Sequence, residues 1–199
     1  MTDRVVLFLD YQNVYMSARS LFHPMGAPHW NGQIDPLALG RLLVDRSPFD
    51  RELAGVRVYR GLPESTKDPK GYGASQRQIS SWAQAPEIEV ITRTLRYPQN
   101  WPTEKPKEKG IDVALAIDFA LMDVRGDYDV GVLMSTDTDL KPALEAVAGS
   151  GTARAEVAAW SNPNGYSRRL SIKGRNLWCH WLDETDYLRV RDTRDYNIP

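Results

Sequence analysis

Apolar runs of strand length alternate along the chain with segments whose apolar residues recur at helical spacing. Short runs rich in branched or aromatic residues predict β-strands over 4–10, 55–61, 88–95, 129–135 and 154–160. Helical spacing predicts helices over 35–45, 74–84, 110–124 and 139–151. Continuous apolar strands separated by helices are typical of a parallel sheet covered on both faces. The pattern therefore predicts an α/β fold, a three-layer α/β/α sandwich with a mainly parallel central sheet.

The least regular segments, 23–34 and 96–109, are rich in Pro, Gly, Asn and Lys. A chain of 199 residues with 42% hydrophobic residues can bury one sizeable core and is short for two independent ones. We therefore expect one domain over 1–199, in which these segments are loops. Residues 161–199 are expected to form a C-terminal extension packed on the core.

Charge and composition exclude several classes of protein. The chain has 25 Lys and Arg against 26 Asp and Glu, so a nucleic-acid site has to be a local patch. The single Cys179 excludes a disulfide framework and a Cys-rich zinc site, and the histidines show no zinc spacing. No P-loop and no G-x-G-x-x-G motif follows the first strand, which removes the main support for a nucleotide-triphosphate or dinucleotide site.

No run of about 18 apolar residues is present, and the first residues lack the order of a signal peptide. These features predict a cytoplasmic protein that does not enter a membrane. They do not determine the oligomeric state, and a homo-oligomer is compatible with them.

Polar side chains follow the ends of two predicted strands. Asp10 closes the first apolar run and Asn13 comes three residues later, while Ser135, Asp137 and Asp139 end or follow the run over 129–135. Ligands of open parallel sheets bind beyond the carboxyl ends of the strands, so these groups can converge if the two strands are neighbours. Asp137 or Asp139 could also serve only as a helix N-cap.

Asp112 is a third acidic position, near the start of the predicted helix over 110–124. It shares one helical face with the apolar residues Leu115, Ala116 and Phe119. A carboxylate on an inward face is costly unless a charge compensates it, and a divalent cation would do so. Complementing the helix dipole is the alternative role.

The segments FLDYQNV (8–14), KGIDVALAIDFA (109–120) and STDTDL (135–140) resemble, in this order and spacing, the NYN domain, a PIN-like nuclease family. The resemblance extends from about residue 4 to about residue 160. It implies a PIN-like, Rossmann-like sandwich and a metal-dependent ribonuclease site. The family's site residues match Asp10, Asn13, Asp112, Asp137 and Asp139.

Oxygen ligands of this kind suit hard cations, which predicts one or two Mg²⁺ or Mn²⁺ ions. We expect Asp10, Asp112 and Asp137 to be the principal metal ligands, with Asp139 assisting and Asn13 orienting a water or a phosphate.

Ser135 and Asp118 are assigned to supporting positions around these ligands. Asp118 lies six residues from Asp112, roughly 240° around and about 9 Å along a helix, which is too far to share one ion.

Basic and aromatic residues just before the 110–124 helix are candidates for substrate contact. They are Arg93, Arg96, Tyr97, Trp101, Lys105, Lys107 and Lys109. They suit phosphate contact and base stacking on a single strand, although a solvated loop with chance aromatics fits the pattern equally well. Arg168 and Arg169 are further candidates, for which an amphipathic helix with a basic outer face is the alternative.

The favoured hypothesis is a metal-dependent endoribonuclease that hydrolyses phosphodiester bonds of single-stranded or structured RNA. The alternatives are an RNA-binding or protein-interaction module with weak or no catalysis, and another Mg²⁺-dependent phosphoesterase acting on DNA. The complete set of acids favours hydrolysis, because clustered carboxylates beside RNA have no evident use in a module that only binds.

Overall fold

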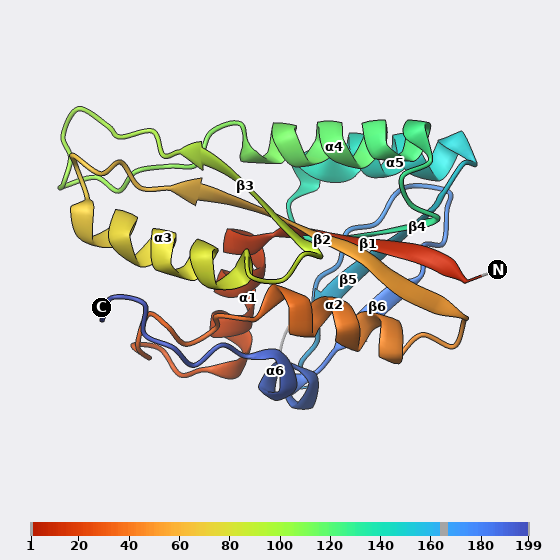
Figure 1. Cartoon of the computed structure of the whole chain (residues 1–199), viewed down its shortest axis with the longest axis horizontal. Coiled ribbons are helices and arrows are strands. Elements are labelled where there is room, and N and C mark those ends of the chain that lie inside the picture. Colours follow the sequence, from red (N-terminus) through yellow and green to blue (C-terminus); the bar gives the residue numbers. More distant parts are fainter. Residues whose placement is uncertain (1, 164–166, 199) are drawn as a thin grey trace.

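The computed structural model describes residues 2–163 and 167–198, and its centre is a parallel sheet (Figure 1). The strands are β1 (Asp3–Asp10), β2 (Arg51–Leu62), β3 (Ile88–Thr94), β4 (Val130–Met134), β5 (Arg154–Trp160) and β6 (Cys179–Leu182). They lie side by side in the order β3-β2-β1-β4-β5-β6, and each neighbouring pair is parallel. The predicted parallel sheet is confirmed.

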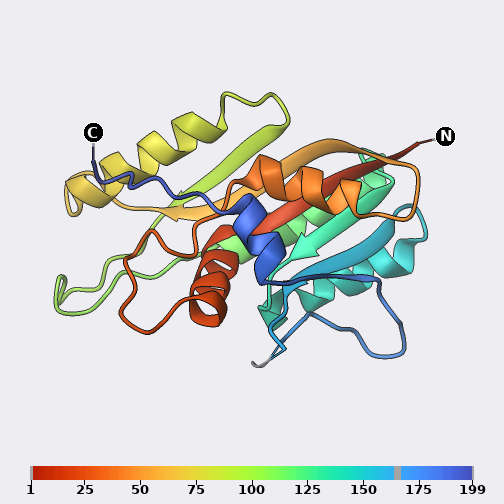
Figure 2. The ribbon, with the colours of Figure 1, turned by 90° about the horizontal axis from the view of Figure 1, so that it is seen from below.

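Helices cover both faces of the sheet (Figures 1 and 2). One face carries α1 (Tyr11–Phe22), α2 (Pro36–Asp45), α3 (Pro69–Trp82) and α6 (Glu184–Val190). The other carries α4 (Ile111–Arg125) and α5 (Lys141–Ser150), and a short 3-10 turn, η1 (Thr138–Leu140), leads into α5. These layers confirm the expected α/β/α sandwich. No helix in the described ranges is long and apolar enough to cross a membrane.

The two central strands, β1 and β4, are apolar because both of their faces are covered. Phe8 packs edge to face on Phe119 of α4, with the ring centroids 5.0 Å apart, and Tyr128 joins the same cluster. A Cβ atom at Gly131 of β4 would lie 2.7 Å from the Phe119 ring, so this position needs glycine for the aromatic cluster to reach the sheet. This packing fixes β1 against β4.

The chain reverses its direction of winding between β1 and β4. From β1 it continues to β2 and β3 on one side, and from β4 to β5 and β6 on the other. Ligands of such sheets bind at the carboxyl edge where the order reverses. Leu9 pairs with Met134, so Asp10 and Ser135, the next residues in each chain segment, face this crevice.

Several boundaries differ from the prediction. β2 begins at Arg51 rather than residue 55, and α3 begins at Pro69, after the capping side chain of Asp68, rather than at residue 74. The sequence pattern missed β6 and α6. The basic segment 167–178 forms no helix, since Leu170 and Ile172 are buried two residues apart, as in an extended chain. The helical alternative for Arg168 and Arg169 is therefore wrong.

Candidate active site

Asp10 ends β1 and is also the N-cap of α1. Its side chain is 4% exposed. One carboxylate oxygen accepts the backbone N–H of Asn13 at 3.3 Å, and the other accepts the hydroxyl of Ser135 at 2.7 Å. Burial raises the pKa of Asp10 to about 6, with added repulsion from Asp112 and Glu108, although the two hydrogen bonds act in the opposite direction. Asp10 is thus a buried carboxylate whose charge the chain compensates incompletely.

Ser135 connects Asp10 to the acids after β4. Its Oγ accepts the backbone N–H of Asp137 at 3.0 Å while its hydroxyl donates to Asp10. The Asp137 side chain accepts the backbone N–H of Asp139 at 2.9 Å and so caps η1. Both Asp10 and Asp137 therefore serve as helix caps, and the same turns bring their carboxylates to one edge of the sheet.

Asn13 lies in the first turn of α1 and contacts the same loop. Its side-chain oxygen accepts both the backbone N–H and the hydroxyl of Thr136, at 3.0 and 3.1 Å. The contact fixes the start of α1 against the segment that carries Asp137.

Asp112 reaches the site from the opposite face of the sheet, in the first turn of α4. This helix begins after Gly110, whose φ of 78° suits glycine. Burial raises the pKa of Asp112, and repulsion from Asp137 and Asp139 raises it further. The structure therefore brings Asp10, Asp112, Asp137 and Asp139, which we call the acid cluster, close enough together for mutual repulsion.

Glu108 is an acid near the cluster that the sequence analysis missed. The backbone N–H of Gly61 donates to its carboxylate, and a Cβ atom at Gly61 would lie only 2.8 Å from Glu108 Cγ. Burial raises the pKa of Glu108, and Asp112 raises it by repulsion. In the sequence Glu108 stands between two lysines, as is typical of a solvated loop. No sequence motif indicates that it contacts Gly61.

The donor types of the acid cluster suit a hard divalent cation, and repulsion among carboxylates is what a cation would relieve. Within residues 2–163 and 167–198, however, no three Asp, Glu, His or Cys side chains are arranged to hold one ion together. The chemistry of the donors thus fits Mg²⁺ or Mn²⁺, while direct ligation by three acids would require the side chains to move closer.

Asp118 lies outside the acid cluster. It accepts hydrogen bonds from Arg57 at 3.0 Å and from the hydroxyl of Tyr59 at 2.8 Å, and so ties α4 to β2. Asp118 therefore forms an ion pair that holds the fold together.

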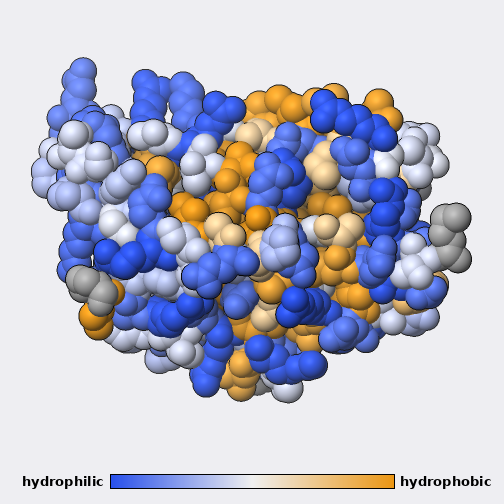
Figure 3. All heavy atoms as spheres, in the orientation of Figure 1, coloured by the Kyte–Doolittle hydropathy of each residue, from blue (hydrophilic) through white to orange (hydrophobic). Residues whose placement is uncertain are grey.

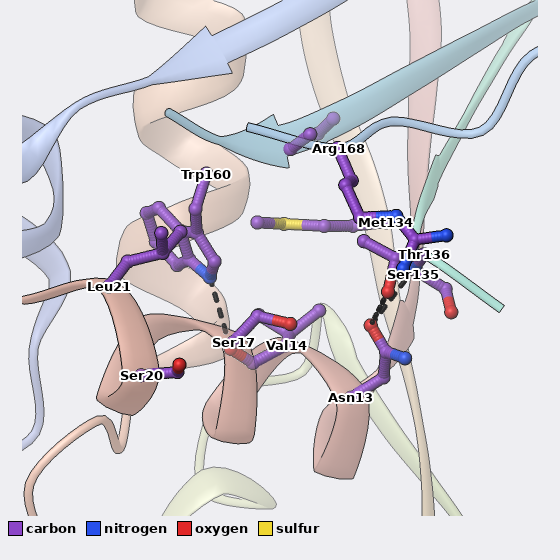
Figure 4. Close-up of a pocket in the computed structure, with 12 residues that line it drawn as sticks. Asn13, Val14, Ser17, Ser20, Leu21, Met134, Ser135, Thr136, Trp160 and Arg168 are labelled. Carbon is purple, nitrogen blue, oxygen red and sulfur yellow. Dashed lines mark hydrogen bonds between the residues drawn. The ribbon is translucent and has the colours of Figure 1, made fainter. Parts of the chain in front are cut away.

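A pocket of about 230 Å³ adjoins the acid cluster on the α1 side (Figure 4). Asn13, Ser135 and Thr136 form the wall next to the acids. Trp160 lies against α1, and Arg168 lies across the pocket from α1. The indole N–H of Trp160 donates to the carbonyl of Val14 at 3.0 Å. Of the neighbouring candidates Arg168 and Arg169, Arg168 lines this pocket, whereas Arg169 donates to the carbonyl of Leu177.

The basic loop after β3 extends beyond the carboxyl edge of the sheet (Figure 2). Its cationic side chains are all exposed: Arg96, Lys105, Lys107 and Lys109. Arg93, near the end of β3, is exposed as well. Backbone hydrogen bonds between Arg96 and Lys107 close the loop. The rings of Tyr97 and Trp101 pack edge to face with centroids 4.9 Å apart, and Lys67 lies over Tyr97. The two aromatic residues therefore pack on each other rather than standing apart as separate stacking platforms.

Comparisons with known proteins give one family match. A search among curated proteins found no match. Among solved structures, a protein of unknown function from Vibrio parahaemolyticus, VPA0982, matches with a TM-score of 0.49 and 19% identity, covering 79% of this chain and 81% of that one. The NYN domain family matches residues 4–171, most of the chain and the whole of the candidate site. The chain therefore belongs to the NYN domain family, a family of PIN-like, nuclease-like domains.

Proposed function

We propose that the protein is a metal-dependent endoribonuclease whose reaction centre is the acid cluster. The observation that carries the proposal is the buried carboxylate of Asp10 at the reversal point of the sheet, with a pKa of about 6 and further acids nearby. Burying an incompletely compensated charge lowers the stability of the fold. A hydrolytic site explains why such a charge is present, because the buried carboxylate can bind a cation there.

A bound Mg²⁺ or Mn²⁺ would activate a water and neutralise charge on the phosphate. We assign Asp10, Asp112 and Asp137 as its principal ligands, directly or through water, with Asp139 assisting. Ser135 orients Asp10 and the Asp137 backbone through its two hydrogen bonds. The Asn13 oxygen is engaged by Thr136, so we assign its side-chain NH₂ group to contact a water or a phosphate oxygen.

RNA would reach this site through local positive charge, because the net charge of the chain is -1. The exposed cations of the 93–109 segment and Arg168 at the neighbouring pocket are the candidates. A cytoplasmic location stays a prediction.

A cleavage assay on labelled RNA and DNA of one sequence separates this function from its alternatives. We expect RNA cleavage with Mg²⁺ or Mn²⁺ and none with EDTA, and we expect Asp112→Asn to reduce it by at least about 10–100-fold because a ligand charge is lost. Asp45→Asn, at an exposed acid at the end of α2, is the matched control and should cleave normally.

Two results of the same assay would redirect the proposal. Binding of RNA without cleavage under any metal condition would favour an interaction module. Equal or faster cleavage of DNA would favour a more general phosphoesterase.

A further inference from the structure

Arg60, near the carboxyl end of β2, is a deeply set cation on the face covered by α1 and α3. One terminal nitrogen donates to the side-chain oxygen of Gln78 at 2.5 Å, and the other donates to the hydroxyl of Ser75 at 3.2 Å. The guanidinium lies over the rings of Tyr11 and Trp82, 5.3 and 5.7 Å from their centroids. All four partners are neutral, so they orient the charge without balancing it.

No carboxylate of the described residues lies within 4 Å of this guanidinium, and its buried Nε has no hydrogen-bond partner. Other arginines of the same strand differ. Arg57 forms ion pairs with Glu89 and Asp118, and Arg51 forms one with Glu156. Burial lowers the pKa of Arg60, as expected for a charge without a close counter-ion. An anion supplied from outside the chain would complete this environment.

Arg60 lines a pocket of about 300 Å³ near the carboxyl end of β2. The pocket wall includes Tyr11, the residue after Asp10, and Glu108. Glu108 acts electrostatically on both Asp10 and Arg60, so the cation and the reacting edge are near neighbours. A chain of phosphates that placed one group at the acid cluster could place another at Arg60.

We propose that this pocket is a phosphate-binding subsite, in which Arg60 holds a backbone phosphate of the nucleic-acid strand close to the phosphate being cut. The planar guanidinium suits phosphate oxygens, and Gln12, Gln33 and His29 also line the pocket as polar groups. The identity of the strand rests on the proposed function, whereas the phosphate chemistry rests on Arg60 and its surroundings.

The first test measures thermal unfolding as inorganic phosphate is added in the presence of EDTA. Phosphate should stabilise the natural protein, and Arg60→Gln should weaken the apparent affinity by about 10–100-fold, as for loss of a charge-assisted contact. Arg57→Gln, which removes an arginine of the same strand that already has carboxylate partners, should keep the phosphate response. Arg60→Lys keeps the positive charge but loses the planar guanidinium with its two terminal nitrogens, so this variant should bind phosphate more weakly than the natural protein.

Two results would overturn the subsite: no stabilisation of the natural protein by phosphate, or an unchanged response in both Arg60 variants. A purely structural Arg60 would lower the unfolding temperature when replaced and leave the phosphate affinity as it was.

A second measurement connects the subsite to nucleic acid. Binding of a short single-stranded RNA in EDTA, at several salt concentrations, should have a log-log slope about 0.7 smaller in Arg60→Gln. If the natural protein cuts no RNA but this slope and the phosphate response both change, the proposed function fails and the subsite stands. If it cuts RNA and Arg60→Gln binds and cuts equally well, the subsite fails and the proposed function stands.

Discussion

Replacing Asp10 by Asn is expected to make the folded protein more stable at pH 7 in the absence of metal, and to abolish RNA cleavage. The pKa of Asp10 is raised from 3.8 to about 6 in the folded chain, chiefly by burial. Its contribution to stability is therefore present below pH 3.8 and is lost as the pH rises through about 6. At pH 7 the ionised group lowers the free energy of unfolding by up to roughly 3 kcal/mol, a cost that Asn does not carry.

The measurement is urea unfolding in EDTA at pH 4 and pH 7.5, with Asp45→Asn as the exposed control. We expect the advantage of Asp10→Asn to be large at pH 7.5 and to shrink towards zero near pH 4. Asn can keep both hydrogen bonds, because its oxygen can accept the N–H of Asn13 and its NH₂ group can donate to Ser135. A variant that is less stable at pH 7.5 and still cuts RNA would show that Asp10 is only a helix cap.

Replacing Arg51 by Met is expected to destabilise the fold by about 3–5 kcal/mol, because it leaves a buried carboxylate without its main partner. Both terminal nitrogens of Arg51 bind Glu156, at 3.0 and 2.7 Å, and Glu156 also contacts His180 at 2.8 Å. The side chains of Arg51 and Glu156 are 1% and 0% exposed. Although burial acts to raise the pKa of Glu156, the bonds to His180 and Arg51 outweigh it and hold that pKa below its ordinary value.

Urea unfolding at pH 7 measures the loss, and Arg154→Met provides the control. Arg154 pairs with Asp3 at 3.5 Å at the surface, so its removal should change the free energy of unfolding by no more than about 1 kcal/mol. Adding Glu156→Gln to Arg51→Met should restore part of the stability by removing the unpaired charge. A loss below about 1 kcal/mol for Arg51→Met alone would contradict this description of the buried ion pair.

The sequence predicts those parts of the fold that depend on the order of neighbouring residues along the chain. The apolar runs of β1 and β4 need cover on both faces, and Asp10 and Asp137 follow directly from their ends. Parallel pairing of these two strands then makes the two acids neighbours. The start of α4 could be located in the same way, from Gly110 and the apolar spacing behind it.

The parts that sequence misses depend on contacts between distant residues or on short elements. Glu108 joins the site only because Gly61 of β2 leaves room for it. Arg60 is distinctive because its hydrogen-bond and ring partners are neutral, which the spacing of residues in the sequence does not reveal. β6 and α6 have only four and seven residues, too few for a period to be recognised, although α6 has a capping box between Asp183 and Asp186.

One feature of the surface also departs from a simple helical pattern. Val113, Ile117, Leu121 and Val124 are exposed along α4, where Figure 3 shows hydrophobic residues at the upper edge of the molecule. With apolar residues on its buried side as well, α4 is hydrophobic around much of its circumference. The sequence pattern nevertheless identified the inward face correctly, since Leu115 and Phe119 of that face are buried.

Titration of Mn²⁺ into the metal-free protein at pH 7, followed by calorimetry and compared with RNA cleavage, tests whether the acid cluster binds the metal that cleavage needs. We expect the natural protein and Asp45→Asn to bind Mn²⁺ over the same concentration range that activates cleavage. Asp10→Asn and Asp112→Asn should lose Mn²⁺ binding and RNA cleavage together while staying folded. Cleavage that persists in EDTA, or Mn²⁺ binding that is unchanged in both variants, would show that the acid cluster is not a metal-dependent reaction centre.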